Sequence, residues 1–160
     1  KVFHDDNINY TVSSGDNTEI HLRQLADCLT ALQDDPDKTT GIVIYPDAYD
    51  DFDHYLAVLE AAETLLSDMD IEDNYQLASF HPHYRFEGSD ADDAANYTNR
   101  SPLPMLHIIR QRDVSDARQN YPDIERVPEH NIDKLRELGT TSLQSSLDEL
   151  ITHYDKMVNG

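Results

Sequence analysis

The strongest constraint on the fold is a short apolar run, Gly41 to Tyr45 (GIVIY), which lies between two long amphipathic segments. An unbroken apolar run of this length is typical of a central strand that is buried on both faces. The segments before and after it, residues 16–33 and 50–69, repeat their apolar residues at the spacing of one helix face. A buried strand between two amphipathic helices indicates an α/β fold.

Three other segments are predicted to be strands, because they combine strand-forming residues with flanking polar or turn residues. They cover Ile8 to Ser13, Tyr75 to Phe80 and Met105 to Arg110. Helical patterns follow around residues 114–120 and 128–138, and Gly139 is expected to end the second of these helices.

Two short motifs mark expected helix starts. Asp16 with Glu19 resembles a capping box at the first helix, and Thr141 with Gln144 resembles one at the last helix. The complete order is β-α-β-α-β-loop-β-α-α. It predicts an α/β fold with a small, mainly parallel or mixed four-stranded sheet covered by helices. In the mixed version the fourth strand pairs antiparallel with the third.

The chain of 160 residues has the length of one domain, so residues 1–160 are predicted to form a single unit. No stretch reaches the roughly 18–20 apolar residues that a membrane-spanning helix needs. The chain begins at Lys1 rather than at a methionine, and we therefore expect an N-terminal segment to be missing.

The net charge is strongly negative: 32 Asp and Glu residues stand against 12 Lys and Arg residues, which gives −20. Such a charge repels nucleic acids and anionic membrane surfaces, so neither is expected as a partner. Aspartate dominates the acids and lysine is scarce. This composition suits a salty cytoplasm, and it equally suits an ordinary acidic bacterial protein. In both cases the predicted location is cytoplasmic.

Two kinds of chemistry are not expected. The lone cysteine, Cys28, can form no internal disulfide and falls in the apolar stripe of the first helix, which predicts a buried core residue. The five glycines are scattered singly. The chain therefore lacks a glycine-rich phosphate loop, and no nucleotide is expected as a cofactor.

The polar chemistry of the chain is concentrated between His81 and Arg110. The stretch from His81 to Pro104 is about twice as long as the usual connection between strands of a compact domain. In open α/β sheets, ligands bind beyond the carboxyl ends of the strands. That rule places this stretch beside Asp47, which follows the second strand, and predicts the functional site there.

His81 and His83 form an H-x-H motif directly after the third strand. In an extended chain the two side chains lie on one face. With Asp92 or Asp93 they could hold a divalent metal such as zinc or iron. The alternative is that both histidines are ordinary polar residues at a strand end.

His107 lies in the fourth strand, on the same face as Met105 and Ile109. A histidine on an apolar face is typically a hydrogen-bonded core residue, and we favour that interpretation. If its ring reaches the polar segment, it could instead act as a general acid or base, because the ordinary pKa of histidine lies near neutrality.

Six of the eight arginines lie within 42 residues, and most are expected to neutralise nearby acids. Arg100 is the exception, because it lies in the run NYTNRSP. Asn96, Asn99 and Ser101 surround it with amide and hydroxyl groups. A guanidinium among such donors suits a carboxylate or a phosphate, so these four residues are predicted to bind a small anionic ligand.

The same segment carries a family resemblance. The motifs SFHPHYRF, Asp92–Asp93 and NYTNRSP, with the later PEHNI, resemble an uncharacterised bacterial family, domain of unknown function 1415. The resemblance extends from the first strand to Gly139. It implies a bacterial cytoplasmic protein with an additional N-terminal segment that bears an N-x-C-P-F motif. It implies no established activity.

Several hypotheses about function follow. In the first, the chain is a small enzyme for an anionic or carbonyl-containing molecule, which Arg100 orients while a histidine transfers a proton. Its catalytic residues would be His81, His107, Asp92 and Asp93. In the second, the loop is a non-catalytic module that binds an anion or a partner. In the third, it is a self-satisfied hydrogen-bond network beside a homodimer interface.

Overall fold

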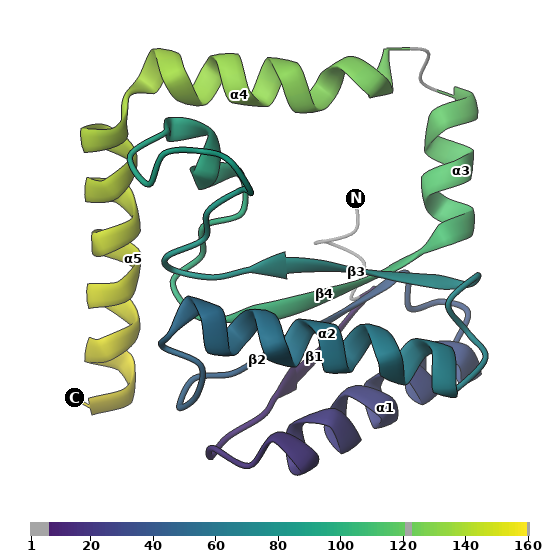
Figure 1. The fold of residues 1–160 in the computed structure, drawn as a ribbon. Helices are drawn as coiled ribbons and strands as arrows, with labels where there is room; N and C mark the ends of the chain where they lie inside the picture. Colours follow the sequence, from purple (N-terminus) through teal and green to yellow (C-terminus); the bar gives the residue numbers. More distant parts are fainter. Residues whose placement is uncertain (1–6, 121–122, 160) are drawn as a thin grey trace.

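The computed structural model describes residues 7–120 and 123–159, which form the expected α/β fold (Figure 1). Strands and α-helices alternate in its first half, and helices dominate the second. The symbol η denotes a short 3-10 helix. In chain order the elements are β1 (Ile8–Val12), α1 (Thr18–Asp34), β2 (Thr40–Ile44), α2 (Phe52–Asp68), β3 (Tyr75–Phe80), η2 (Ala94–Thr98), β4 (Met105–Arg110), α3 (Gln111–Asn120), η3 (Ile124–Arg126), α4 (Val127–Leu138) and α5 (Thr140–Asn159).

The sheet is mixed and has the strand order β1-β2-β4-β3. β1 and β2 are parallel, whereas β4 is antiparallel to both β2 and β3. The mixed version of the prediction is therefore confirmed, and a mainly parallel sheet does not form because β4 returns between β2 and β3. β1, β2 and β3 still point the same way. Their carboxyl ends meet at one edge of the sheet, beside the start of β4.

Helices α1 and α2 cover one face of the sheet and enclose the hydrophobic core with it (Figure 1). Leu25 of α1 and Leu106 and Ile108 of β4 are all 0% exposed. Each such side chain contributes about 1.5–3 kcal/mol when it leaves water. α1 packs tightly on β2 at Gly41, where an added Cβ would lie 3.0 Å from Cys28 Sγ. Cys28 is buried, as its place in the apolar stripe predicts.

The first turns of α1 and α2 are capped by side chains. Asn17 caps α1, because its Oδ1 accepts the backbone N–H of Ile20 at 3.1 Å. The expectation that Asp16 caps this helix is wrong by one residue, since Asn17 is the extended residue directly before the first helical turn. Asp51 caps α2 by accepting the backbone N–H of His54 at 2.8 Å.

Gly139 ends α4, as predicted. Its φ of 78° lies in the left-handed region that favours glycine, and its N–H donates to the carbonyl of Leu135. α5 begins at once with Thr140, one residue earlier than expected. Through this turn α3, α4 and α5 form three sides of an open frame, and η2 lies in the corner between α4 and α5 (Figure 1).

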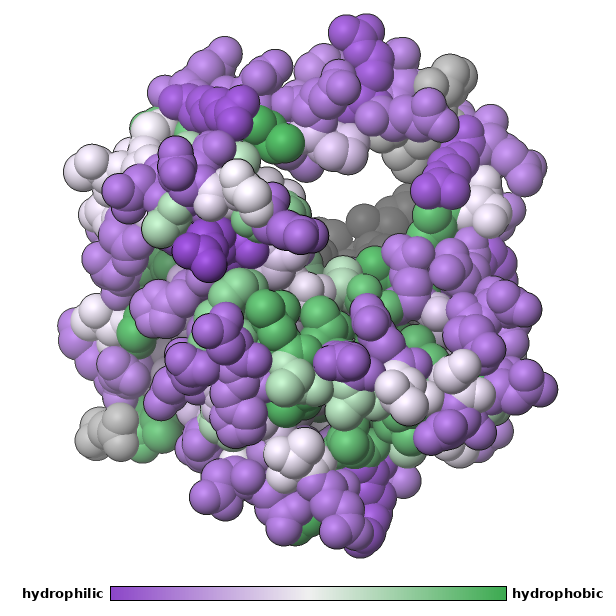
Figure 2. Space-filling model, viewed as in Figure 1, coloured by the Kyte–Doolittle hydropathy of each residue, from purple (hydrophilic) through white to green (hydrophobic). Residues whose placement is uncertain are grey.

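The surface is mostly polar. Hydrophilic side chains cover most of the face seen in Figure 2, and hydrophobic ones gather over α2. Within the described ranges, no helix combines the length and the apolar character that crossing a membrane requires.

Candidate functional site

Residues 81–104, here called the polar loop, start at the edge where β1, β2 and β3 end. Two hydrogen bonds tie these strand ends together. Gly15, after β1, donates its backbone N–H to the carboxylate of Asp47 at 3.2 Å. His81, after β3, donates from Nε2 to the backbone carbonyl of Tyr49 at 2.7 Å. The segment that begins at Asp47 therefore does lie beside His81, as the strand order predicts.

His81 is completely buried at this edge. Its ring centroid lies 5.2 Å from that of Phe52 and 5.1 Å from that of Tyr55. Since Nε2 donates to Tyr49, Nδ1 is an acceptor, and it receives the backbone N–H of His83 at 3.0 Å. Burial lowers the pKa of His81 below its ordinary value. The neutral ring thus fastens the first turn of the polar loop to the segment between β2 and α2.

The H-x-H motif gains little support as a metal site. His83 is exposed, but both ring nitrogens of His81 are engaged in hydrogen bonds. Among the residues that the structure describes, no three His, Cys, Asp or Glu side chains gather as a metal site requires. The assignment of His81 and His83 as ligands stays a prediction.

His107 lies on the sheet face turned away from α1 and α2, because its neighbours in β4 point into the core. The hydroxyl of Thr40 donates to the carbonyl of Ile108 at 2.6 Å, so it accepts from His107 Nε2, also at 2.6 Å. His107 is hydrogen-bonded, as expected, but its ring is only partly buried and is not part of the hydrophobic core, so the core part of the interpretation is wrong. Burial lowers its pKa. The structure does not bring His107 together with His81, which packs on the α2 side.

Asp92 and Asp93 fasten the polar loop to the last two helices. Asp93 accepts the backbone N–H of Ala95 at 2.9 Å and pairs through both carboxylate oxygens with Arg136 of α4, at 2.9 Å for the shorter contact. Hydrogen bonding to Arg136 lowers the pKa of Asp93. The backbone carbonyl of Asp92 accepts the Thr140 hydroxyl of α5 at 3.0 Å. The contacts give Asp92 and Asp93 a structural role, which is to hold the loop against α4 and α5. Their catalytic role stays a prediction.

Asn96 lies at the centre of the polar loop and is 0% exposed. Its Oδ1 accepts the backbone N–H of Phe86 at 3.1 Å and the hydroxyl of Ser89 at 2.8 Å. Its Nδ2 donates to the carbonyls of Asp90 at 2.8 Å and Ala91 at 3.4 Å. The amide is therefore satisfied inside the loop, as a buried polar group must be.

Arg100 is engaged in the same way. Its Nε donates to the carbonyl of Tyr84 at 3.3 Å, and its Nη2 donates to the carbonyl of Ala91 at 2.9 Å. The guanidinium carbon lies 4.4 Å from the centre of the Tyr97 ring, which is a cation–π contact. Arg100 thus braces the backbone of the loop.

Asn99 and Ser101 complete this network. Asn99 donates from Nδ2 to the carbonyl of Ser79 at 2.9 Å, and its own carbonyl accepts the backbone N–H of His81 at 3.1 Å. The hydroxyl of Ser101 donates to the carbonyl of Leu103 at 2.6 Å. Direct ligand binding by Asn96, Asn99, Arg100 and Ser101 stays a prediction; their observed partners all belong to the protein.

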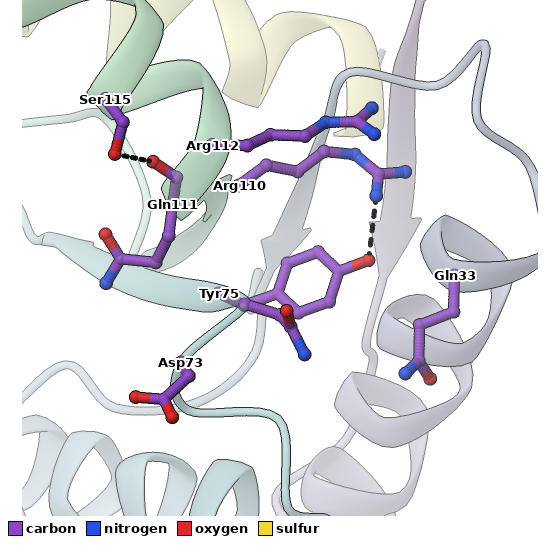
Figure 3. A pocket seen from close by; sticks show the side chains of 8 residues that line it. Gln33, Asp73, Tyr75, Arg110, Gln111, Arg112 and Ser115 are labelled. Atoms are coloured by element: carbon purple, nitrogen blue, oxygen red, sulfur yellow. Dashed lines mark hydrogen bonds between the residues drawn. The ribbon is translucent and has the colours of Figure 1, made fainter.

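A polar cavity of about 520 Å³ lies at the opposite edge of the sheet, around the start of α3 (Figure 3). Arg110 lines it and donates to the hydroxyl of Tyr75 at 3.0 Å. The other guanidinium N–H groups donate to the backbone carbonyl of Leu32 in the last turn of α1, and to those of Asp35 and Lys38, which follow the helix. Carbonyls at a helix C-terminus carry partial negative charge, so Arg110 caps α1 and its own charge is compensated there.

A second cavity, of about 680 Å³, lies between the polar loop and the first turns of α2; we call it the Arg85 cavity. Part of its wall is aromatic. The ring of Tyr84 meets that of Phe52 edge to face at 5.4 Å between centroids, and that of Phe86 at 5.0 Å. Arg85 also lines the cavity, is exposed, and makes no hydrogen bond or ion pair with any residue in the described ranges. The other lining residues are Asp53, Leu56, Glu87, Gly88 and Ser89.

Sequence reasoning favours Arg100 over Arg85, because Arg100 has more donors near it in the chain. A usable signal for Arg85 is the run Tyr84-Arg85-Phe86, in which two aromatic residues flank a cation. What the sequence does not show is that the donors around Arg100 already bind backbone carbonyls of the protein.

The sequence also does not single out Tyr49 and His21, which are buried below the same edge. Tyr49 has a φ of 65°, an uncommon conformation for a residue other than glycine. Its hydroxyl is hydrogen-bonded to His21 Nδ1, and it donates to the hydroxyl of Thr18 at 3.4 Å. Burial raises the pKa of Tyr49. Because its carbonyl holds His81, we interpret this conformation as part of what positions the polar loop.

The fold and this edge define a small α/β protein with a mixed sheet and a long ordered loop at its strand ends. The family model described as "Protein of unknown function (DUF1415)" matches residues 1–145. The chain therefore belongs to this family. No curated protein and no solved structure matches it.

Proposed function

We propose that this protein binds a small molecule with a flat, aromatic body and a single carboxylate in the Arg85 cavity. The observation that carries the proposal is Arg85, which has no partner among the described residues at the wall of an aromatic-lined cavity. Cavities that hold small molecules have volumes of roughly 300–1,000 Å³, so the 680 Å³ here is suitable.

The aromatic wall supports the choice of a flat ligand. Aromatic rings prefer offset or edge-to-face contacts, and Phe52, Tyr84 and Phe86 all line the cavity in which a flat ligand would lie. Contacts of this kind contribute about 0.5–1.5 kcal/mol each beyond the burial of apolar area.

The charges in the cavity support a monoanion. Arg85 offers a planar fork that matches a carboxylate. Asp53 and Glu87 line the same space, and the whole chain carries −20. A ligand with several negative charges, such as a triphosphate, would meet repulsion from both sources.

The interior of the polar loop supports a preformed site. Arg100 holds the carbonyl of Tyr84, and Asn96 holds the N–H of Phe86, which are the residues on either side of Arg85. A backbone fixed at both neighbours orders the site before the ligand arrives and reduces the entropy lost on binding.

Binding without catalysis is the better-supported version of the proposal. His81, whose ring contacts the Phe52 of the wall, has both nitrogens engaged in hydrogen bonds. A general acid or base needs an atom within reach of the proton that it moves. The acidic composition and the family resemblance favour the bacterial cytoplasm as the setting.

The test is calorimetric titration with benzoate, compared with benzamide, its neutral analogue. We expect benzoate to bind more tightly than benzamide and to bind less tightly as salt is added. Arg85→Gln should weaken benzoate binding by up to roughly 5-fold, because an ion pair at an exposed arginine contributes up to about 1 kcal/mol.

The matched control is Arg118→Gln, which removes another exposed arginine that lacks a partner in the described ranges. It should leave benzoate binding unchanged. Both variants should stay within about 0.5 kcal/mol of the unchanged protein in free energy of unfolding. Equal binding of benzoate and benzamide, or an equal effect of the two substitutions, would overturn the proposal.

A further inference from the structure

Helix α5 carries a repeat that is typical of helices that pair with another helix. Its large apolar residues recur at intervals of 4, 3, 4 and 3 residues: Leu143, Leu147, Leu150, Tyr154 and Met157. This is the spacing of the a and d positions of a heptad, which form a continuous seam in a coiled coil. The folded chain covers only part of that seam.

One side of the seam already packs inside the protein. Leu147 is buried, and the hydroxyl of Tyr97 in η2 donates to the side chain of Gln144 at 2.6 Å. The next residue on this inner side, Ile151, is partly buried. The inner side of α5 therefore faces η2 and α4, in the corner of the frame (Figure 1).

The residues that the structure describes leave the other side of the seam largely uncovered. Leu143, Leu150 and Met157 follow one another at intervals of seven residues and form one row along the helix. Leu143 is partly buried, whereas Leu150 is 56% exposed and Met157 is 74% exposed. We call these three residues the outer row. A row of large apolar side chains in water is unfavourable, and such exposure is often the mark of an interaction surface.

The charged residues of this part of α5 avoid the outer row. The b and c positions of the heptad, which are not adjacent to the outer row, hold all four of them: Asp148, Glu149, Asp155 and Lys156. The residues beside the outer row, Ser146 and His153, carry no carboxylate. This arrangement matters in a chain of −20, because a second acidic copy could approach α5 here without placing carboxylates against carboxylates.

We propose that the outer row pairs antiparallel with the outer row of a second copy of this chain. The row is symmetric about Leu150, with Leu143 and Met157 each seven residues away. A two-fold axis at Leu150 places Leu143 of each copy against Met157 of the partner subunit. A surface that matches itself in this way is what a two-fold dimer requires. Antiparallel packing also sets the negative end of each helix dipole beside the positive end of the other.

The dimer is expected to be weak. Stable interfaces bury about 1,200–2,000 Å² in total, and one pair of helices that meet along three residues each buries less. We therefore expect a dissociation constant of roughly 10–100 μM, which a concentration series can reach. The pairing surface lies on α5 and not at the Arg85 cavity, so it is independent of the proposed ligand.

The test is sedimentation velocity of the full chain over a concentration series. The unchanged protein should shift from monomer to dimer as concentration rises. Leu150→Glu places two like charges at the two-fold axis and should keep the protein monomeric at every concentration. Its control is Thr152→Glu, which adds the same charge to the opposite side of α5, and it should dimerise like the unchanged protein. Far-ultraviolet circular dichroism checks that both variants keep their helices.

A second measurement locates the contact. A short thiol cross-linker should join two copies of Leu150→Cys, and it should not join two copies of Thr152→Cys. The native Cys28 is buried and should stay unreactive. A protein that stays monomeric, a Leu150→Glu variant that still dimerises, or a Leu150→Cys variant that does not cross-link would each overturn the proposal.

Discussion

Two cavities at opposite edges of the same sheet each contain arginine, and they differ in what that arginine contacts. In the cavity of Figure 3, Arg110 is buried and donates to a tyrosine hydroxyl and to three backbone carbonyls, those of Leu32, Asp35 and Lys38. Its neighbour Arg112 pairs with Asp113 at 3.4 Å. In the other cavity, Arg85 has aromatic neighbours and no polar partner among the described residues.

The difference teaches that a cluster of arginines has to be divided by the partners of its members. Arg110 and Arg100 hold carbonyls of the protein, so their charge stabilises the fold. Arg85 has donors left for a ligand. The unsatisfied donor, and not the density of polar residues around it, distinguishes the candidate binding arginine.

The largest expected effect is on stability and comes from Arg110→Ala. The substitution leaves the carbonyls of Leu32, Asp35 and Lys38 without their guanidinium donor and creates space beside Tyr75. We expect the free energy of unfolding to fall by about 3 kcal/mol or more, measured by urea denaturation.

Arg112→Ala is the control in the same cavity. Its side chain is exposed, so the free energy of unfolding should change by no more than about 0.5 kcal/mol. Equal losses in the two variants would remove the distinction between a buried capping arginine and an exposed one.

A smaller loss is expected for Arg100→Ala. The variant loses the hydrogen bonds to Tyr84 and Ala91 and the contact with Tyr97, which together predict a fall of about 1–3 kcal/mol in the free energy of unfolding. Urea denaturation measures this loss, with Arg118→Ala, which changes an exposed arginine of α3, as the control. If both variants are as stable as the unchanged protein, the bracing role of Arg100 is wrong.

The smallest expected effect is a dependence of stability on pH. Burial lowers the folded-state pKa of His81 and His107 below the ordinary value of 6.5, so near this pH the unfolded chain binds protons that the folded chain does not. The stabilisation is complete above pH 6.5 and declines as the pH falls through that value toward the folded-state pKa. Urea midpoints measured at about pH 8, 7, 6 and 5 should therefore decrease toward acid.

His107→Gln separates the two histidines in that experiment. In this variant the urea midpoint should still decrease toward acid because of His81, but by less than in the unchanged protein, because the contribution of His107 is lost. Midpoints of the unchanged protein that stay level or rise as the pH falls from about 7 to about 5 would contradict the lowered pKa of the two rings.

Local patterns predict much of this fold. The apolar spacing of residues 16–33 and 50–69 predicts α1 and α2, and the bounds of β3 and β4 match the expected ones. Gly139 ends α4 as expected. These features depend on neighbours in the chain, so the sequence contains their cause directly. The predicted cap of α1 is wrong by one residue. Asp16 and Asn17 are both good capping residues, and the position of the first helical turn decides between them.

The location of the polar chemistry is also predicted, whereas its division into roles is not. Loop length and strand order place His81 beside the end of β2, and the bond to Tyr49 confirms that position. Neither feature shows that Asn96 is buried, that Asp93 pairs with Arg136 of α4, or that Arg85 lacks a partner. Those contacts join residues up to 43 positions apart.

By itself, then, the sequence determines an acidic α/β chain with four strands, amphipathic helices and a polar loop at the carboxyl ends of its strands. Periodicity and composition express these properties, because each follows from the side chains of a local segment. Tertiary structure decides that β4 enters between β2 and β3, that the interior of the loop satisfies its own hydrogen bonds, and which arginine keeps donors for a ligand. These outcomes depend on which groups from distant parts of the chain come into contact. The order of residues alone does not show which hydrogen bonds form between such groups.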